Sequence, residues 1–555
     1  MRHLFVLAAF LAFTTPAAAQ TRMVAAAHPL AAEAGLGVLR EGGSAVDAAV
    51  AVQMVLGLVE PQSSGIGGGA FLVFRAAAGG MRSWDGRETA PHAATPDLFL
   101  TAEGRPMAFY DAVVGGRAVG VPGAVAMLAA AHRAEGRLAW ASLFAPAIRL
   151  SEEGFAVSPR LARAIAAEGA RLQQDPAARA YFFLPDGSPL PAGHRLRNPD
   201  YAETLRLLAR EGPEALYRGE IAEKIVAAVR GADWNPGRMT LADLAAYRAV
   251  ERPVLCGRFR LFRVCGMGPP SSGGIAVLQI LGLLDHFALP ARAPFADIAH
   301  LGIEAGKLAF ADRAAYLGDP DFVAVPAAGL LDPAYLIVRA QLIDPDRAQT
   351  PRAGNPPWRQ GAFRPAEPFA AEAGTSHLSI VDAFGNAVAM TTTVEDAFGA
   401  RIMAAGFILN NQLTDFAFVP EARGRVVANR VEAGKRPRSS MAPTIVERAD
   451  GGLHAVVGSP GGARIIGYVA KALVGMLAWN LDPQAAIDLP NVLTVGTVAE
   501  LEAETAAAEL APLLAARGQR VALRPLESGL QAIVVAPSGL SGGADRRREG
   551  VALGE

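Results

Sequence analysis

A hairpin pattern over residues 377–394 constrains the fold of this chain more than any other feature. The alternating segments HLSIV and AVAMTTTV flank DAFGN, which is typical of a hairpin turn. Folding the hairpin about Phe384-Gly385 brings Thr393 to within one residue of the position opposite Thr375. The first strand therefore begins with a polar group, Thr375-Ser376-His377, that has a polar neighbour across the ladder.

Helical patterns dominate the chain before about residue 350. The stretches PDYAETLRLLAREG (199–212) and TLADLAAYRAV (240–250) have helical periodicity, and the second begins with Thr240 as a cap and Asp243 three residues later. The apolar stretch Ala45–Val59 is too short to span a bilayer and predicts a buried helix. A stretch rich in proline, glycine and arginine (350–368) then breaks all periodicity and predicts a mobile linker.

Strand patterns follow this stretch. A second hairpin, PTIVERADGGLHAVVG, turns at Asp450-Gly451 and leads into GSPGG (458–462), after which residues 463–477 have helical periodicity. The order of helices, strands and a further helix predicts sheets packed between helical layers. An apolar content of 51% provides enough material for such a core.

The N-terminal residues predict export. Arg2 and His3 precede the apolar run Leu4–Phe13, and the sequence PAAA supplies a small-residue cleavage site, so residues 1–19 have the form of a secretory signal peptide. The alternative is a membrane anchor, but the run is far shorter than the roughly 20 residues that cross a bilayer. A formal net charge of -1 without long charge runs argues against nucleic-acid partners.

The chain has only two cysteines, Cys256 and Cys265. A turn at Gly257-Arg258 would place Cys256 opposite Phe259 and leave Cys265 beyond the reach of a disulfide. We therefore expect two free cysteines, and no cysteine-rich metal site.

The Gly374-Thr375 junction has a possible catalytic meaning. A threonine hydroxyl is a poor nucleophile unless a base lies beside it, and the α-amine of an N-terminal threonine can be that base. This amine exists only if the bond between Gly374 and Thr375 is cut. Its reference pKa of about 7.7 to 8.0 would make it largely available at neutral or mildly alkaline pH. By itself, however, a Thr-Ser-His group at the start of a strand usually consists of side chains that cap the strand or face solvent.

Several blocks in the chain resemble the gamma-glutamyltranspeptidase family, the glutathione hydrolases of the N-terminal nucleophile hydrolase superfamily. The resemblance runs nearly end to end and includes AAEAGLGVLREGGSAVDAAVAVQMVLGLVEPQSSGIGGGAF, WDGRETAP, MGPPSSGGIAVLQIL, ADRAAYLGDPDFV, GTSHLSIVD, NNQLTDF, KRPRSSMAPTIV and GSPGGARII. It implies an α+β fold, a four-layer αββα sandwich. It also implies autocleavage at Gly374 and Thr375 into a large subunit, residues 20–374 with its linker at 350–374, and a small subunit, residues 375–555.

The resemblance also implies roles for individual residues. Thr375 matches the nucleophile and Thr393 the threonine that supports it, while Gly461 and Gly462 match the glycines of the oxyanion hole. The positions that match contacts to the substrate's α-carboxylate and α-ammonium, or neighbour them, are Arg87, Glu395, Gln412, Asp415, Ser439 and Ser440. Two features depart from the family. Glu395 stands where many members have asparagine, and residues 416–434 contain no tyrosine or tryptophan that would cover the pocket.

The expected protein is a periplasmic or secreted gamma-glutamyltransferase that acts through a threonyl ester. Its expected partners are glutathione and other γ-glutamyl compounds, amino-acid or peptide acceptors, and the two subunits of one precursor, without a metal or organic cofactor. One alternative keeps the fold but changes the substrate, as in glutaryl and cephalosporin acylases. An uncleaved periplasmic binding protein is a second alternative, and a serine hydrolase of the nucleophile-elbow type is a third.

Overall fold

The computed structural model describes residues 20–290, 295–357, 374–422 and 424–555. The predicted signal peptide and residues 358–373 of the predicted linker lie outside the described residues. No helix in the described ranges is both long enough and apolar enough to cross a membrane.

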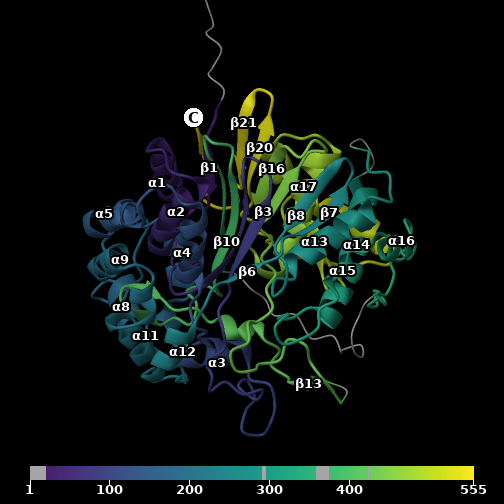
Figure 1. The fold of residues 1–555 in the computed structure, drawn as a ribbon. Helices are drawn as coiled ribbons and strands as arrows, with labels where there is room; N and C mark the ends of the chain where they lie inside the picture. Colours follow the sequence, from purple (N-terminus) through teal and green to yellow (C-terminus); the bar gives the residue numbers. More distant parts are fainter. Residues whose placement is uncertain (1–19, 291–294, 358–373, 423) are drawn as a thin grey trace, which may run out of the picture.

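Two large sheets form the centre of the molecule (Figure 1). The first has the order β22 (Val551–Gly554), β1 (Met23–Ala26), β9 (Gly374–Val381), β10 (Ala387–Glu395), β2 (Gly69–Arg75), β3 (Met81–Gly86) and β6 (Val250–Arg252). The second has the order β21 (Gly539–Ala544), β20 (Gln531–Ala536), β16 (Leu453–Gly458), β15 (Thr444–Glu447), β8 (Phe262–Gly266) and β7 (Leu255–Phe259).

The side chains of the first sheet alternate between two hydrophobic cores. On β1, Val24 and Ala26 belong to the core shared with α1 (Pro29–Arg40), α2 (Ala45–Val59) and α4 (Ala124–Glu135), whereas Met23 and Ala25 face the second sheet. The second sheet is covered on its other side by α13 (Gly273–Leu284), α14 (Phe295–Tyr316) and α17 (Ile465–Ala478). The layers are therefore helix, sheet, sheet and helix, which confirms the predicted αββα sandwich (Figure 1).

The remaining elements surround these layers. They are the helices α3 (Phe109–Val113), α5 (Ala145–Glu153), α6 (Pro159–Ala167), α7 (Gly169–Leu172), α8 (Pro176–Phe182), α9 (Pro199–Glu211), α10 (Glu214–Tyr217), α11 (Glu220–Arg230), α12 (Leu241–Ala246), α15 (Ala327–Leu330), α16 (Pro333–Ala340), α18 (Pro483–Asp488) and α19 (Ala511–Ala516), and the strands β4 (Phe155–Ala156), β5 (Arg195–Leu196), β11 (Met403–Ala404), β12 (Phe407–Ile408), β13 (Glu421–Ala422), β14 (Arg425–Val426), β17 (Val492–Val495), β18 (Val498–Glu502) and β19 (Arg520–Arg524).

The predicted helices form, with one change of length. Every residue of α2 is buried, and Ser44 and Asp47 close a capping box at its start. Helix α12 also begins with the predicted cap, because Thr240 accepts from the Asp243 backbone and Asp243 binds back to Thr240. It ends at Ala246 rather than near residue 250, because the chain leaves the helix to add β6 to the first sheet.

Both predicted hairpins are present. β9 and β10 pair about the predicted turn, with Thr393 directly opposite Thr375. β15 and β16 pair about Asp450-Gly451. The helix predicted from residue 463 begins as a short 3-10 turn, η4 (Gly462–Arg464), and continues as α17.

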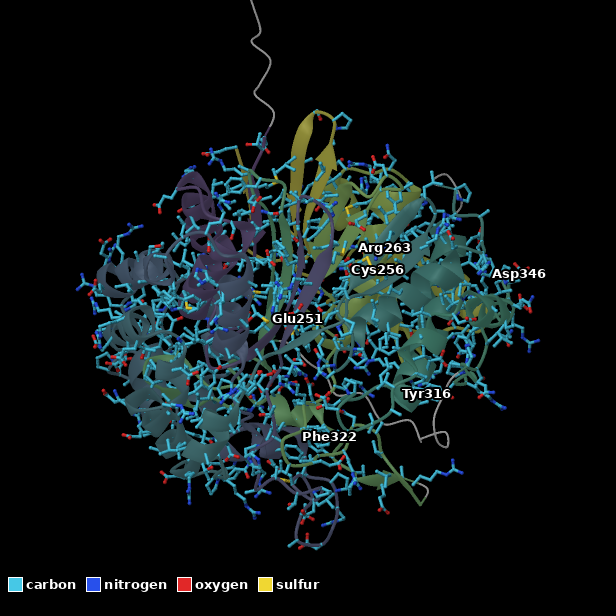
Figure 2. All side chains as sticks on the ribbon, in the orientation of Figure 1. Glu251, Cys256, Arg263, Tyr316, Phe322 and Asp346 are labelled. Atoms are coloured by element: carbon cyan, nitrogen blue, oxygen red, sulfur yellow. A yellow bond between two sulfur atoms is a disulfide. The ribbon has the colours of Figure 1, made fainter. Side chains whose placement is uncertain are left out.

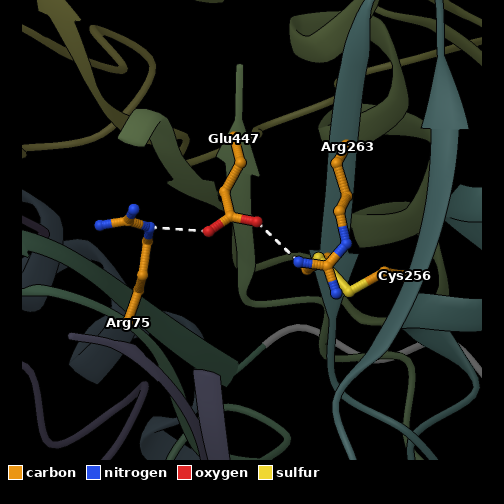
Figure 3. The surroundings of a disulfide bond; sticks show 5 residues. Arg75, Cys256, Arg263 and Glu447 are labelled. Carbon is orange, nitrogen blue, oxygen red and sulfur yellow. Dashed lines mark hydrogen bonds and ion pairs between the residues drawn. A yellow bond between two sulfur atoms is a disulfide. The ribbon is translucent and has the colours of Figure 1, made fainter. Parts of the chain in front are cut away.

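The prediction of two free cysteines is wrong. The turn lies at Arg260-Leu261, three residues beyond the expected position, so Cys256 and Cys265 are directly paired on β7 and β8. Their Cα atoms are 4.1 Å apart and the sulfurs form a disulfide (Figures 2 and 3). Gly257 supplied a misleading turn signal, because this glycine is an ordinary strand residue.

An ion bridge beside the disulfide connects the two sheets. Glu447 on β15 accepts from Arg75 Nε on β2 at 2.8 Å and from Arg263 Nη1 on β8 at 2.7 Å (Figure 3). Arg75 and Glu447 are both buried. The buried contact between Arg75 and Glu447 therefore joins β2 of the first sheet to β15 of the second.

Candidate active site

Thr375 lies between the two sheets, at the start of β9. Its side chain shares a strand face with His377 and Ser379, and Ser379 Oγ donates to the carbonyl of Gln531 on β20 at 3.1 Å. Thr375 itself is only 4% exposed. The candidate nucleophile therefore lies in a site that is enclosed by both sheets.

The Thr375 hydroxyl is held against the bond that precedes it. Thr375 Oγ1 donates to the carbonyl oxygen of Gly374 at 2.7 Å and lies 3.1 Å from Thr393 Oγ1. Thr393 Oγ1 also donates to the Gly374 carbonyl and accepts from the backbone N–H of Glu395, the latter at 2.8 Å. A Cβ at Gly374 would lie 2.6 Å from the carbonyl oxygen of Asp396, so only glycine fits here.

His377 supports the strand and does not act as a charged group. Its Nδ1 lies 2.9 Å from Thr391 Oγ1 and its Nε2 lies 3.1 Å from Ser379 Oγ. Complete burial lowers the pKa of His377 to about 3, so the ring is neutral at physiological pH.

The Glu395 carboxylate accepts hydrogen bonds from other residues of the protein. A bulge shifts the register between Thr393 and Glu395, and Glu395 has a φ of 84°, a region that suits asparagine better than glutamate. Its carboxylate accepts from Asn411 Nδ2 and, at 3.4 Å, from Thr414 Oγ1. Glu395 thereby connects the nucleophile's hairpin to the 3-10 turn η3 (Gln412–Asp415).

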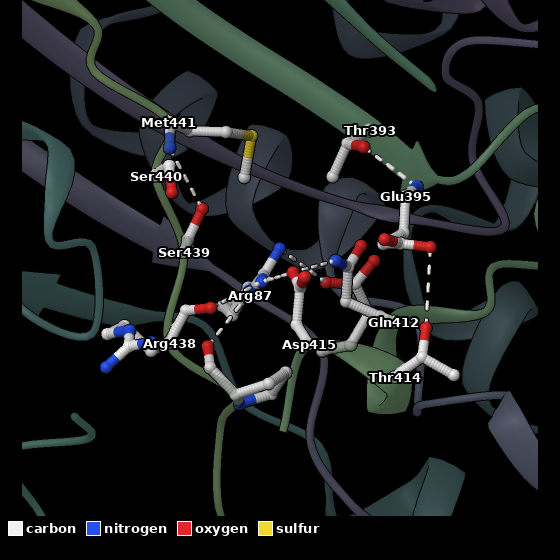
Figure 4. A network of polar contacts seen from close by, with 12 residues as sticks. Arg87, Thr393, Glu395, Gln412, Thr414, Asp415, Arg438, Ser439, Ser440 and Met441 are labelled. Atoms are coloured by element: carbon white, nitrogen blue, oxygen red, sulfur yellow. Dashed lines mark hydrogen bonds and ion pairs between the residues drawn. The ribbon is translucent and has the colours of Figure 1, made fainter. Parts of the chain in front are cut away.

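A buried ion pair forms the second part of the site (Figure 4). Arg87, 1% exposed, follows β3 and donates through Nη2 to Asp415 Oδ2, which also accepts from Gln412 Nε2 at 2.6 Å. The backbone carbonyls of Pro437 and Arg438 accept from the same guanidinium, each at 3.1 Å. Two residues that the family resemblance assigns to opposite charges of one ligand therefore contact each other.

Ser439 and Ser440 lie beside this pair, in the segment that precedes β15 (Figure 4). Ser439 Oγ accepts from the backbone N–H of Met441 at 3.1 Å, and Ser440 Oγ accepts from Arg313 Nη2 at 2.8 Å. Since each oxygen is engaged as an acceptor, each hydroxyl proton can be given to a ligand anion.

Gly461 and Gly462 come at the start of η4, where Gly461 is the N-cap residue with a φ of 127°. In the described part of the chain, no acceptor receives a hydrogen bond from the backbone N–H of either glycine. Two free donors at the start of a helix are suited to a developing negative charge.

Sequence reasoning missed three supporting residues. Asn411 orients Glu395, Arg313 holds Ser440, and Arg548 donates through Nη1 to the carbonyl of Thr375 at 3.2 Å. Asn411 and Arg313 stand inside or at the edge of motif blocks and were detectable there as polar positions. Arg548 stands in a run of three arginines near the C-terminus, and no pattern distinguishes it from the other two.

Comparison with known proteins identifies the family. Residues 31–555 match the family described as gamma-glutamyltranspeptidase. The chain belongs to this family. It is 38% identical over 545 residues to a glutathione hydrolase proenzyme of Bacillus subtilis (strain 168), covering 96% of this chain and 91% of that one. The fold and the resemblance read from the sequence are thus confirmed, and the protein is an enzyme of the gamma-glutamyltranspeptidase type.

Acylases are similar to this chain as well. The chain is 37% identical to an acylase ACY 1 proenzyme of Pseudomonas sp. (strain V22), covering 96% of this chain and 94% of that one. A crystal structure of a cephalosporin acylase from Bacillus halodurans superposes with a TM-score of 0.85 at 28% identity, covering 99% of both chains. The fold therefore accommodates more than one acyl group, and the substrate must be argued from the site.

Proposed function

We propose that this enzyme hydrolyses or transfers the γ-glutamyl group of glutathione and related γ-glutamyl amides. The observation that carries the proposal is the buried pair of Arg87 and Asp415. An α-amino acid head group brings one carboxylate and one ammonium, so it can separate this pair and leave neither charge unpaired. A ligand that lacks the ammonium would leave Asp415 buried without a cation, which is costly.

The binding roles follow from this arrangement. Arg87, Ser439 and Ser440 bind the substrate's α-carboxylate, and Asp415 binds its ammonium together with Gln412. A planar guanidinium with two donors in parallel suits a carboxylate. Glu395 acts by orienting Asn411 at the start of η3, which keeps Gln412 and Asp415 in place.

The nucleophile is produced by self-cleavage. Thr375 Oγ1 attacks the carbonyl carbon of Gly374, and its proton passes to the departing amide nitrogen. Water then hydrolyses the resulting ester, which leaves a carboxylate on Gly374 and a free α-amine on Thr375. The contacts of Thr375 and Thr393 with the Gly374 carbonyl support this step, because both hydroxyls lie at the bond to be cut.

Turnover repeats the same chemistry on the substrate. The Thr375 amine accepts the hydroxyl proton as Oγ1 attacks the γ-carbonyl, and the N–H groups of Gly461 and Gly462 stabilise the oxyanion. The departing amine takes the proton and leaves a γ-glutamyl ester. Water or the amine of an amino acid or peptide then releases the γ-glutamyl group.

Export to the periplasm or the medium belongs to the same proposal. The sequence of residues 1–19 supports it, and so does the disulfide between Cys256 and Cys265, since disulfides persist mainly in oxidising compartments.

Two anilides that differ in one group test the substrate assignment. A γ-glutamyl anilide carries the α-ammonium and the matching glutaryl anilide lacks it. We expect a preference of at least about 100-fold in kcat/KM for the γ-glutamyl compound, equivalent to about 2.7 kcal/mol. Asp415→Ala should shrink this preference by slowing the γ-glutamyl reaction, without preventing self-cleavage.

The control is Asp346→Ala, because Asp346 lies at the outer edge of the molecule (Figure 2). This variant should retain the wild-type preference. The acylase relatives make the opposite outcome meaningful: equal rates, or a preference for the glutaryl compound, would make this protein an acylase of the same fold.

A further inference from the structure

Arg548 belongs to neither the ion pair nor the hairpin of the candidate site. It lies in the turn between β21 and β22, and this turn is anchored by Asp545. Asp545 Oδ2 accepts from Ser528 Oγ at 2.5 Å and from the backbone N–H of Leu530 at 3.3 Å. The C-terminal end of the chain thereby directs one arginine side chain toward the start of β9.

The Arg548 guanidinium connects the nucleophile to Glu527, in a segment that packs against the loop of the predicted oxyanion hole. Nη1 donates to the carbonyl of Thr375 and Nη2 to the carbonyl of Glu527, both at 3.2 Å. A Cβ placed on Gly529 would lie 2.6 Å from Pro460 Cγ and 2.7 Å from Arg548 Cδ. Arg548 therefore packs beside Pro460, next to Gly461.

Arg548 brings a positive charge that no nearby carboxylate neutralises. In the described ranges no carboxylate forms an ion pair within 4.0 Å of its guanidinium, and the titratable groups with the largest electrostatic effect on it are Arg160, Glu60, Tyr468 and Glu527. Arg160 and Glu60 pair with each other at 2.5 Å, and Glu527 contacts Arg548 through its backbone carbonyl.

His28 and Glu549 are two further titratable groups close to the pair of Arg160 and Glu60. Burial lowers the pKa of His28, which keeps it neutral near pH 7, and Glu549 accepts from the backbone N–H of Arg160 at 2.9 Å. Burial also lowers the pKa of Arg548 to about 10, so Arg548 still carries its charge at neutral pH.

We propose that Arg548 is a positioning residue for the nucleophile, both by holding the Thr375 carbonyl after cleavage and by favouring the neutral form of the new amine. This inference rests on the proposed self-cleavage. Cutting the bond after Gly374 removes the covalent restraint on Thr375, and the contact at its carbonyl then keeps the residue in line with β9. A nearby like charge disfavours the protonated amine, so more of it is available as a base.

Two variants separate the charge from the side chain. Arg548→Gln loses the charge and Arg548→Lys keeps it. With a γ-glutamyl anilide, the acid limb of kcat/KM against pH should lie about one pH unit higher for the Gln variant, with up to about tenfold lower activity below that limb. The Lys variant should have the wild-type limb. Arg546→Gln is the matched control, because the Arg546 side chain is 78% exposed and points to Asp488.

Chain cleavage is measured on denaturing gels for every variant, and the kinetic results are interpreted together with it. If the Gln variant folds with wild-type thermal stability but stays a single chain, while the Lys variant cleaves, Arg548 already positions Thr375 in the precursor and the proposal holds. Wild-type acid limbs in both variants overturn it, and so does equal failure of both. If the wild-type protein itself is never cleaved, the proposed function fails, and the inference fails with it.

Discussion

Two threonines on adjacent strands hold the bond that the proposed mechanism cuts. Thr393 Oγ1 donates to the Gly374 carbonyl, whose oxygen gains negative charge when Thr375 attacks. Thr393→Val keeps the shape of the side chain but removes this donor. We expect self-cleavage to slow by roughly 100-fold or more, which is typical for the loss of one donor to an oxyanion.

Thr393→Ser is the matched control, because it retains the hydroxyl and should cleave at nearly the wild-type rate. The measurement is the time course of chain splitting after synthesis, followed on denaturing gels. A Val variant that matures as fast as the Ser variant would show that this hydroxyl only supports the hairpin.

Glu88 illustrates how burial can prevail over a nearby opposite charge. Its carboxylate lies 3.9 Å from Arg87 Nη1, but Arg87 already bonds to Asp415. Complete burial therefore dominates and raises the pKa of Glu88 from 4.5 to about 8. Between these two pH values the folded protein binds a proton that the unfolded chain has lost, so the free energy of unfolding falls as pH rises.

Glu88→Gln should remove this pH dependence, because the amide has no proton to lose. Relative to the wild type, the melting temperature of the variant should rise progressively between pH 5 and pH 8. The difference can reach about 1.4 kcal/mol for each pH unit. Glu223→Gln, at an exposed position of α11, serves as the control. If the melting temperatures of Glu88→Gln and the wild type change in the same way with pH, Glu88 is ionised in the folded protein.

At the scale of elements, the sequence predicted local pairing well wherever the turn signal was genuine. Asp382 to Asn386 do form the predicted turn, so the register that places Thr393 opposite Thr375 could be derived from spacing alone. Gly257 gave an equally plausible signal and misplaced the turn of β7 and β8, because the loop at Arg260-Leu261 contains neither glycine nor asparagine.

The disulfide on this hairpin should stabilise the enzyme. It closes a short loop with a sequence separation of 9, for which the chain-entropy estimate is about 2 to 3 kcal/mol. The double variant Cys256→Ser with Cys265→Ser should therefore unfold at a lower denaturant concentration than the untreated wild type. A reductant should lower the stability of the wild type and leave the variant unchanged. Thiol reagents that label the denatured, unreduced wild type would contradict the disulfide.

At the scale of the whole molecule, the layers were predictable but the site's long-range contacts were not. Helical and alternating patterns give the αββα order, yet β2 and β3 were hidden within the helix-rich first part of the chain. The pair of Arg87 and Asp415 joins residues 328 positions apart, and Arg548 reaches Thr375 from 173 positions away. Such contacts depend on how the two sheets pack, which no local pattern encodes.

The two proposed subunits also interlock. β9 and β10, from the part after Gly374, lie between β1 and β2 from the part before it. Each part thus completes the other's sheet, and cleavage at Gly374 would leave the sheet intact.

N-terminal sequencing of the purified protein tests whether self-cleavage makes Thr375 the N-terminal nucleophile. We expect two fragments under denaturing conditions, the smaller beginning Thr375-Ser376-His377. We also expect Thr375→Ala to abolish both cleavage and turnover, because one hydroxyl serves both steps. A single uncut chain that hydrolyses γ-glutamyl anilide, or an active small fragment with any other first residue, would contradict this role of Thr375.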